Sequence, residues 1–277
     1  MLKQILVLMG ETPASQTARD YACQLGRTVG AGLTGIAGVD LAYIEAPMAG
    51  GIGTMAYKRE LERTLKSQAA SLQAQLRESF ETECRARGVG FSWLAFEGEP
   101  VPMLSEAAET RDLVVTGYDT AFRGGIRENH SETLSELCRL MPRPVVIAPD
   151  SPSRHADILV AYDGSAASMR ALQMFVLLGI GRGRRVHVVA IDYDETRAAR
   201  RAAAAATYLK VHDFETVATP IASYGVPAEI LRRQVVERNI GLLVMGAYGN
   251  RGLADFLFGS TSTALTEAPP CMLFLYH

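Results

Sequence analysis

Short, uninterrupted apolar runs alternate with amphipathic segments along this chain, and the whole series occurs twice. Residues 4–9 begin the first series and residues 158–162 begin the second. Apolar runs of this length are typical of strands that are covered on both faces. Strands that alternate with helices indicate a parallel sheet joined by right-handed crossovers. We therefore expect an α/β protein in which one unit is repeated.

Both halves follow the same predicted order of strands and helices. The strands are expected at residues 4–9, 33–39, 89–96, 112–116 and 144–148, and again at 158–162, 186–191, 215–223, 241–245 and 272–276. The helices are expected at residues 14–30, 57–87, 101–110 and 131–140, and again at 166–178, 195–212, 227–238 and from 260 onward. The long helix at 57–87 lacks a strict heptad, which favours packing on its own sheet over a coiled-coil partner.

The chain of 277 residues is long enough for two domains of roughly 140 residues each. Residues 150–154, Asp-Ser-Pro-Ser-Arg, are typical of a linker. We expect domains at residues 1–150 and 155–277. The two last strands, at 145–148 and 272–276, are apolar and uncharged. Each would promote aggregation if it were left as an open sheet edge. We expect them to pair in a pseudo-dimer of the two domains, and we leave a further homodimer open.

The composition excludes several classes of protein. A net charge of −2 does not indicate a protein that binds nucleic acid. The arginine-rich stretches 182–185 and 197–201 are interpreted as solvated faces rather than a basic patch. Because the sequence lacks a long apolar span and a signal pattern, we expect a cytoplasmic protein without membrane contact. The four cysteines and five histidines show no spacing typical of a disulfide framework or a metal site, and buried thiols are expected.

Residues 243–263, LVMGAYGNRGLADFLFGSTST, have the spacing G-x2-G-x9-G-S-T. Gly246, Gly249 and Gly259 lack a β-carbon, so we expect them to adopt positive φ and bring backbone N–H groups close to an anion. Ser260 and Thr261 follow where a helix would present unpaired N–H groups and its positive dipole end. The pattern predicts a polyphosphate-binding loop; the alternative is that the glycines only shape turns after a strand.

This loop resembles the nucleotide loop of the universal stress protein family, in its ATP-binding branch. A second mark of the family is the stretch 158–165, Ile-Leu-Val-Ala-Tyr-Asp-Gly-Ser. The resemblance covers nearly the whole chain as two copies, and it implies tandem Rossmann-like (adenine nucleotide alpha hydrolase-like) domains, each a five-stranded parallel sheet flanked by helices. It further implies ATP contacts at Asp163, Ala190, Met245, Gly246, Gly249, Gly259, Ser260 and Thr261. Asp163 is expected near the adenosine, and backbone groups near Ala190 at the adenine edge.

The sequence presents groups that recognise a nucleotide but no positioned catalytic base or nucleophile. We therefore expect an ATP-binding regulatory protein of the stress response. A slow ATPase or nucleotide-transfer enzyme is the alternative, and a structural dimer module with an empty crevice is a third possibility. Arg251 is a candidate for contact with the terminal phosphates, and Asp255 for holding Mg²⁺ on a bound triphosphate, although exposed loop residues would look the same.

The two halves differ at the positions that carry the motif. Aligning them places Gly10 under Asp163, Thr120 under Gly249 and His130 under Gly259. A side chain at these loop positions would stand where the backbone has to touch phosphate, and a β-branched residue resists positive φ. We therefore expect one ATP per chain, held by the second half. Arg123 and Arg127 leave a different anion or an acidic partner open for the first half.

Overall fold

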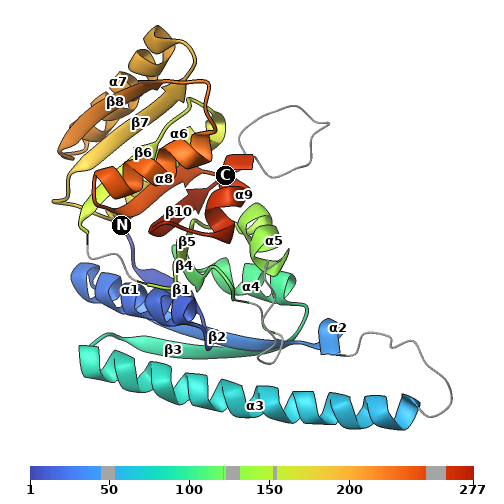
Figure 1. Cartoon of the computed structure of the whole chain (residues 1–277). Helices are drawn as coiled ribbons and strands as arrows, with labels where there is room; N and C mark the ends of the chain where they lie inside the picture. The colour runs from blue at the N-terminus through green and yellow to red at the C-terminus, as the bar shows by residue number, and fades with distance from the viewer. Residues whose placement is uncertain (45–53, 121, 123–131, 152–154, 248–259) are drawn as a thin grey trace. The chain divides into compact units, whose positions relative to one another are not determined.

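The computed structural model describes residues 1–44, 54–120, 122, 132–151, 155–247 and 260–277 (Figure 1). By its contacts the chain divides into two compact units, which are described separately. The first unit is Lys3–Pro142, and the second unit consists of Met1–Leu2 and Arg143–His277. Of the helices within the described ranges, none combines the length and the apolarity that crossing a bilayer requires.

The first unit contains a parallel sheet in the order β3-β2-β1-β4. Its strands are β1 (Gln4–Leu8), β2 (Gly32–Asp40), β3 (Phe91–Gly98) and β4 (Leu113–Gly117). Its helices are α1 (Pro13–Val29), α2 (Leu41–Ile44), α3 (Thr54–Arg87), α4 (Pro100–Ala108) and α5 (Glu132–Leu140). Contacts of α1 with α3 and of α4 with α5 fit right-handed crossovers, which place one pair of helices on each face of the sheet.

The second unit repeats this arrangement and adds two strands, β10 and β5 (Figure 1). Its strands are β5 (Val145–Ala148), β6 (Asp157–Ala161), β7 (Val186–Asp192), β8 (Thr216–Ala222), β9 (Ile240–Gly246) and β10 (Met272–Tyr276). Its helices are α6 (Ala166–Leu178), α7 (Glu195–Val211), α8 (Pro227–Glu237) and α9 (Ser260–Glu267). The strand order is β5-β10-β9-β6-β7-β8, and every pair is parallel except β5 with β10.

Burial along the strands explains why the sequence pattern predicts this fold. Four of the five residues of β1 and all five of β4 are buried, as expected for central strands covered on both faces. The edge strands β3 and β8 instead consist mostly of exposed and partly buried residues, and Phe96 of β3 is buried. Helix α6 and strand β10 have the predicted bounds. The prediction of an α/β fold with parallel sheets flanked by helices is therefore confirmed.

Strand β5 pairs antiparallel with β10. Leu273 lies opposite Ile147, and Phe274 lies opposite Val146. These four side chains are buried, so the pairing covers two apolar edges. Because of it, β5 groups by contact with the second unit, although the sequence pattern makes it the last strand of the first repeat. Pairing of the two whole domains stays a prediction.

Candidate functional site

The carboxyl ends of β6 and β9 lie side by side in the second unit. The two strands are parallel neighbours, and Ala161 is in register with Met245. Asp163 follows Ala161 by two residues, and Gly246 is the last residue of β9. Both candidate residues therefore lie at the rim where open α/β sheets bind their ligands.

Asp163 belongs to the turn that begins α6. Its Oδ1 accepts a hydrogen bond of 2.9 Å from the N–H of Ser165, and Gly164 adopts a φ of +78°, which favours glycine. Ser165 then caps the helix by accepting from the N–H of Ser168 at 3.2 Å. Desolvation by neighbouring atoms would raise the pKa of Asp163, but hydrogen bonds from Ser165 and Ser168 outweigh it and hold the pKa below its usual value. The exposed carboxylate is therefore ionised at neutral pH.

Gly246 packs against the first turn of α6. A β-carbon on Gly246 would lie 2.5 Å from the backbone nitrogen of Ser168 and 2.6 Å from the carbonyl carbon of Ala167. Gly246 does not have a positive φ, so the expectation that it uses one to approach an anion is wrong. Its counterpart Gly117 makes the same close approach, at 2.7 Å, to the nitrogen of Ser15. The glycine that both halves share therefore serves helix packing.

A cluster of one carboxylate and two guanidinium groups lies beside this turn, at the end of β7. Asp192 accepts two hydrogen bonds of 2.6 Å from Arg197 and one of 2.6 Å from Arg201. The Arg197 hydrogen bonds hold the pKa of Asp192 well below its usual value. The Nε of Arg201 lies 3.2 Å from the position of a β-carbon on Gly164, next to Asp163. The sequence interpretation missed this cluster, although an Asp at a strand end with arginines five and nine residues later was the available signal.

Two exposed tyrosines stack at the carboxyl ends of β7 and β8. The rings of Tyr193 and Tyr224 have centroids 5.9 Å apart and an interplanar angle of 16°. Their exposed fractions are 61% and 90%, and the Arg197 guanidinium lies 4.5 Å from the Tyr193 centroid. An exposed flat aromatic face beside a cation is suited to stacking with another planar ring. Sequence reasoning missed this pair because each tyrosine stands alone in its loop.

The candidate residues Ala190 and Met245 have buried side chains, so only their backbone atoms are available to a ligand. The carbonyl of Val189 accepts from Tyr162 on the β6 side, and that of Asp192 accepts from Ser223 on the β8 side. Backbone groups alternate between the two sides of a strand. Those of Ala190 therefore face β8, whereas those of Ile191 face the β6 side, beyond the end of β6 at Ala161.

The remaining candidates lie on the loop between β9 and α9. Ser260 and Thr261 begin α9, and Ser260 is exposed. Gly249, Gly259, Arg251 and Asp255 lie outside the described residues, as do His130, Arg123 and Arg127 of the first half. Within the described ranges no group of three or more His, Cys, Asp or Glu side chains is arranged to hold a metal ion.

The corresponding crevice of the first unit is occupied by hydrogen bonds among its own side chains. Thr12 caps α1 and donates to the Asp119 carboxylate at 2.7 Å. The hydroxyls of Ser15 and Thr120 lie 3.1 Å apart, and Thr120 is buried. A β-carbon on Gly10 would lie 2.6 Å from the Ser15 hydroxyl, so an aspartate there would displace this network.

Residues 156–277 match the model of the universal stress protein family. None of the curated proteins matches the chain. A universal stress protein from Archaeoglobus fulgidus DSM 4304 is similar over 99% of this chain and 97% of its own, with 19% identity and a TM-score of 0.67. A functionally unknown protein from Pseudomonas aeruginosa PAO1 is similar over 99% and 92%, with 15% identity and a TM-score of 0.62.

A shorter solved structure is a universal stress protein family protein from Arabidopsis thaliana with AMP bound. It is 12% identical and covers 53% of this chain and 90% of its own, with a TM-score of 0.35. The two longer structures share the α/β fold of this chain along nearly its whole length.

Proposed function

We propose that the second unit, whose residues 156–277 match the model of the universal stress protein family, binds ATP at the carboxyl ends of β6, β7 and β9. The observation that carries the proposal is the Asp163 carboxylate, which is exposed and ionised at the rim where β6 and β9 end. A fixed carboxylate of this kind accepts hydrogen bonds from ribose hydroxyls or from an adenine amino group.

The backbone of Ile191 supplies the selectivity for adenine. Its N–H and C=O face the same side of β7, beyond the end of β6, and so form a donor and an acceptor next to each other. Adenine presents the complementary pair, an acceptor at N1 and a donor at N6, whereas guanine presents the opposite order. This arrangement favours ATP over GTP, and it supports Ile191 rather than Ala190 as the contact at the adenine edge.

The glycine loop and the start of α9 complete the proposed site. Gly249 and Gly259 allow close backbone approach, and Ser260 and Thr261 offer hydroxyl and N–H donors at the N-terminus of α9. Arg197 and Arg201 add two positive charges against the single charge of Asp192 at the neighbouring strand end. Mg²⁺ enters with the triphosphate, to which it binds by phosphate oxygens.

We propose that the first unit binds no ATP. In its crevice the Asp119 carboxylate accepts a hydrogen bond from Thr12, the residue that caps α1. A negative charge there opposes a phosphate group at the same helix N-terminus. Thr120, in place of Gly249, is buried against Ser15 and would have to leave its hydrogen bond before a ligand entered.

The test compares two substitutions that remove the same charge from one unit. Asp163→Asn removes the proposed ligand contact, whereas Asp213→Asn changes an exposed residue beyond α7 whose φ of 66° suits asparagine. A hydrogen bond to a charged group contributes about 1.5–3 kcal/mol, so Asp163→Asn should weaken ATP binding at least about tenfold in calorimetry on the full chain. Asp213→Asn should leave it unchanged, and GTP should bind the unmodified chain more weakly than ATP. Equal ATP affinity in both variants would refute the site.

A further inference from the structure

Two cysteines meet in the first unit, away from the nucleotide site proposed for the second. Cys23 on α1 and Cys84 on α3 are both fully buried, with exposed fractions of 0%. Helices α1 and α3 pack against each other, and neither cysteine is in a disulfide. The sequence predicts four separate buried thiols, because it does not show which turns of α1 and α3 face each other.

Ion pairs fix the two helices on either side of the cysteines. Glu83 pairs with Arg19 on α1 at 2.6 Å and with Arg87 on its own helix at 2.6 Å. Arg87 also pairs with Asp20 on α1. Asp20 precedes Cys23 by one helical turn, and Arg87 follows Cys84 by one turn, so the ion pairs hold these two turns together. The two cysteines therefore lie on helix turns that are held against each other, as a disulfide between helices requires.

The thiol pair is chemically unlike the other two cysteines. The hydrogen bond from Cys84 lowers the pKa of Cys23 despite burial and the nearby carboxylates, and Arg87 contributes in the same direction. The same hydrogen bond, together with burial, raises the pKa of Cys84. Burial raises the pKa of Cys138 and Cys271 to about 12 each. Because the thiolate is the reactive form of cysteine, Cys23 is the favoured nucleophile among the four.

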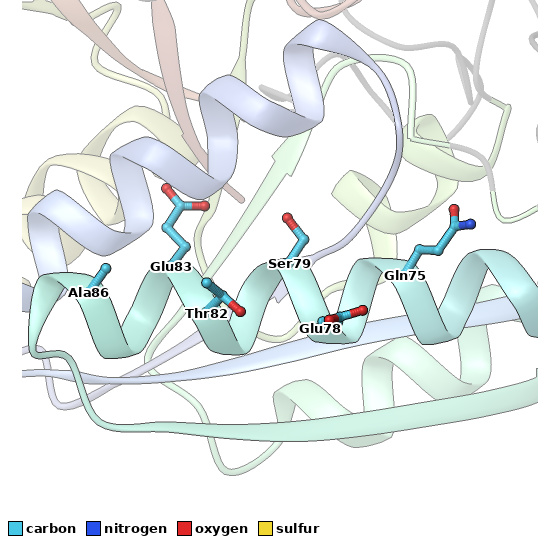
Figure 2. A pocket seen from close by; sticks show the side chains of 6 residues that line it. All are labelled: Gln75, Glu78, Ser79, Thr82, Glu83 and Ala86. Atoms are coloured by element: carbon cyan, nitrogen blue, oxygen red, sulfur yellow. The ribbon is translucent and has the colours of Figure 1, made fainter.

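A shallow surface groove runs along the neighbouring face of α3. It is lined by Gln75, Glu78, Ser79, Thr82, Glu83 and Ala86 (Figure 2). Figure 2 shows the Glu83 side chain directed toward α1. Glu83 adjoins Cys84 in the chain and forms the ion pairs with Arg19 and Arg87. The groove therefore admits a small oxidant to the residue next to Cys84, while Cys84 itself is buried and does not line the groove.

We propose that Cys23 and Cys84 are a modification site that a hydroperoxide converts into a reversible disulfide between α1 and α3. The Cys23 thiolate attacks one peroxide oxygen, the O–O bond breaks, and the product is a sulfenic acid with release of water or an alcohol. The Cys84 thiol then attacks the Cys23 sulfur, forms the S–S bond and expels the sulfenic oxygen as water. Together the two thiols lose two electrons and two protons, and the peroxide is reduced; a dithiol reverses the reaction by exchange.

The experiment maps thiols in the full chain after treatment with hydrogen peroxide. The protein is then denatured in N-ethylmaleimide, digested and analysed by mass spectrometry. We expect a linked peptide pair containing Cys23 and Cys84 with the loss of two hydrogens, complete alkylation of Cys138 and Cys271, and loss of the linked pair after dithiothreitol. A Cys138→Ser variant is the matched control and should give the same link.

Two further results decide the role of each sulfur. In Cys84→Ser the link cannot form, so Cys23 should accumulate as a sulfenic acid that dimedone labels, while the folded protein keeps its circular dichroism spectrum. If that variant does not fold, the map of the unmodified chain and of Cys138→Ser decides alone. The proposal is overturned if all four thiols remain alkylated after peroxide, or if Cys138 and Cys271 oxidise as fast as Cys23. ATP is absent from every step, so the outcome is independent of the proposed nucleotide site.

Discussion

A β-carbon on Gly246 would lie 2.5 Å from the backbone nitrogen of Ser168, at the first turn of α6. Gly117 has the same relationship to Ser15 in the first unit, at 2.7 Å. Both glycines end a central strand, and each lies directly beside a helix N-terminus. The repeated glycine thus belongs to the fold of each unit, and the nucleotide contacts that we propose at Asp163 and Gly249 involve residues that differ between the units.

The packing role of this glycine can be measured in the first unit, where no ATP site is proposed. Gly117→Ala should lower the free energy of unfolding by about 1–3 kcal/mol, because an added methyl group overpacks the contact with Ala14 and Ser15. Gly90→Ala is the control, since a β-carbon there has no atom within 4 Å. Urea denaturation of both variants is the measurement. Equal stability of the two would show that the helix turn moves aside without cost.

The β5–β10 pairing predicts where a charge is not tolerated. Phe274→Lys places an ammonium group at a fully buried position opposite Val146, so we expect the variant to aggregate or to unfold at much lower denaturant concentration. Val217→Lys introduces the same charge on the edge strand β8, at a position that is 41% exposed, and should be nearly neutral. A soluble and stable Phe274→Lys protein would contradict the buried position of β10.

The two stacked tyrosines predict an aromatic contribution to ligand binding. If an adenine ring stacks on this pair, Tyr193→Ala should weaken ATP binding by about 0.5–1.5 kcal/mol, whereas Tyr193→Phe should preserve it. Tyr57→Ala, which removes an exposed tyrosine of α3, is the control. Titration calorimetry on the three variants is the measurement, and an unchanged affinity in Tyr193→Ala would exclude stacking at this position.

The lowered pKa of Asp163 predicts a pH dependence of stability. The folded-state pKa lies below the unfolded value of about 3.9, so the contribution is fully present above that value and is lost as pH falls through the folded pKa. The stability difference between the unmodified chain and Asp163→Asn should therefore be constant from pH 7 to about 5 and shrink in more acidic solution. Denaturation curves at several pH values measure it. A difference that grows on acidification would contradict the hydrogen bonding described for Asp163.

Local sequence signals predicted most of the elements because they report the local backbone. Helix α6 has its predicted bounds, with Ser165 as the cap and Gly179 in a left-handed conformation after its last residue. The four-residue helix α2 was missed because it is too short to show a period. The sequence also led to a wrong expectation of positive φ at Gly246. A glycine that permits close packing cannot be distinguished by sequence from one that adopts positive φ.

The arrangement of side chains from different elements could not be predicted in the same way. The contact of Cys23 with Cys84 depends on how α1 and α3 rotate about their axes, and the sequence does not fix that rotation. The choice between Ala190 and Ile191 depends on which side of β7 each backbone group faces, which requires the register with β6. Asp192 forms ion pairs with Arg197 and Arg201. In the sequence these arginines resemble the solvated face of a helix, so the ion pairs could not be predicted from them.

The central claim is that this chain carries a single ATP site, in its second unit. Isothermal titration of ATP with Mg²⁺ into the full chain tests it most directly, because one experiment gives both affinity and stoichiometry. The account predicts about one ATP per chain, with the binding heat lost or greatly reduced in Asp163→Asn. Binding of two ATP molecules per chain, or a full stoichiometry and affinity retained in Asp163→Asn, would contradict it.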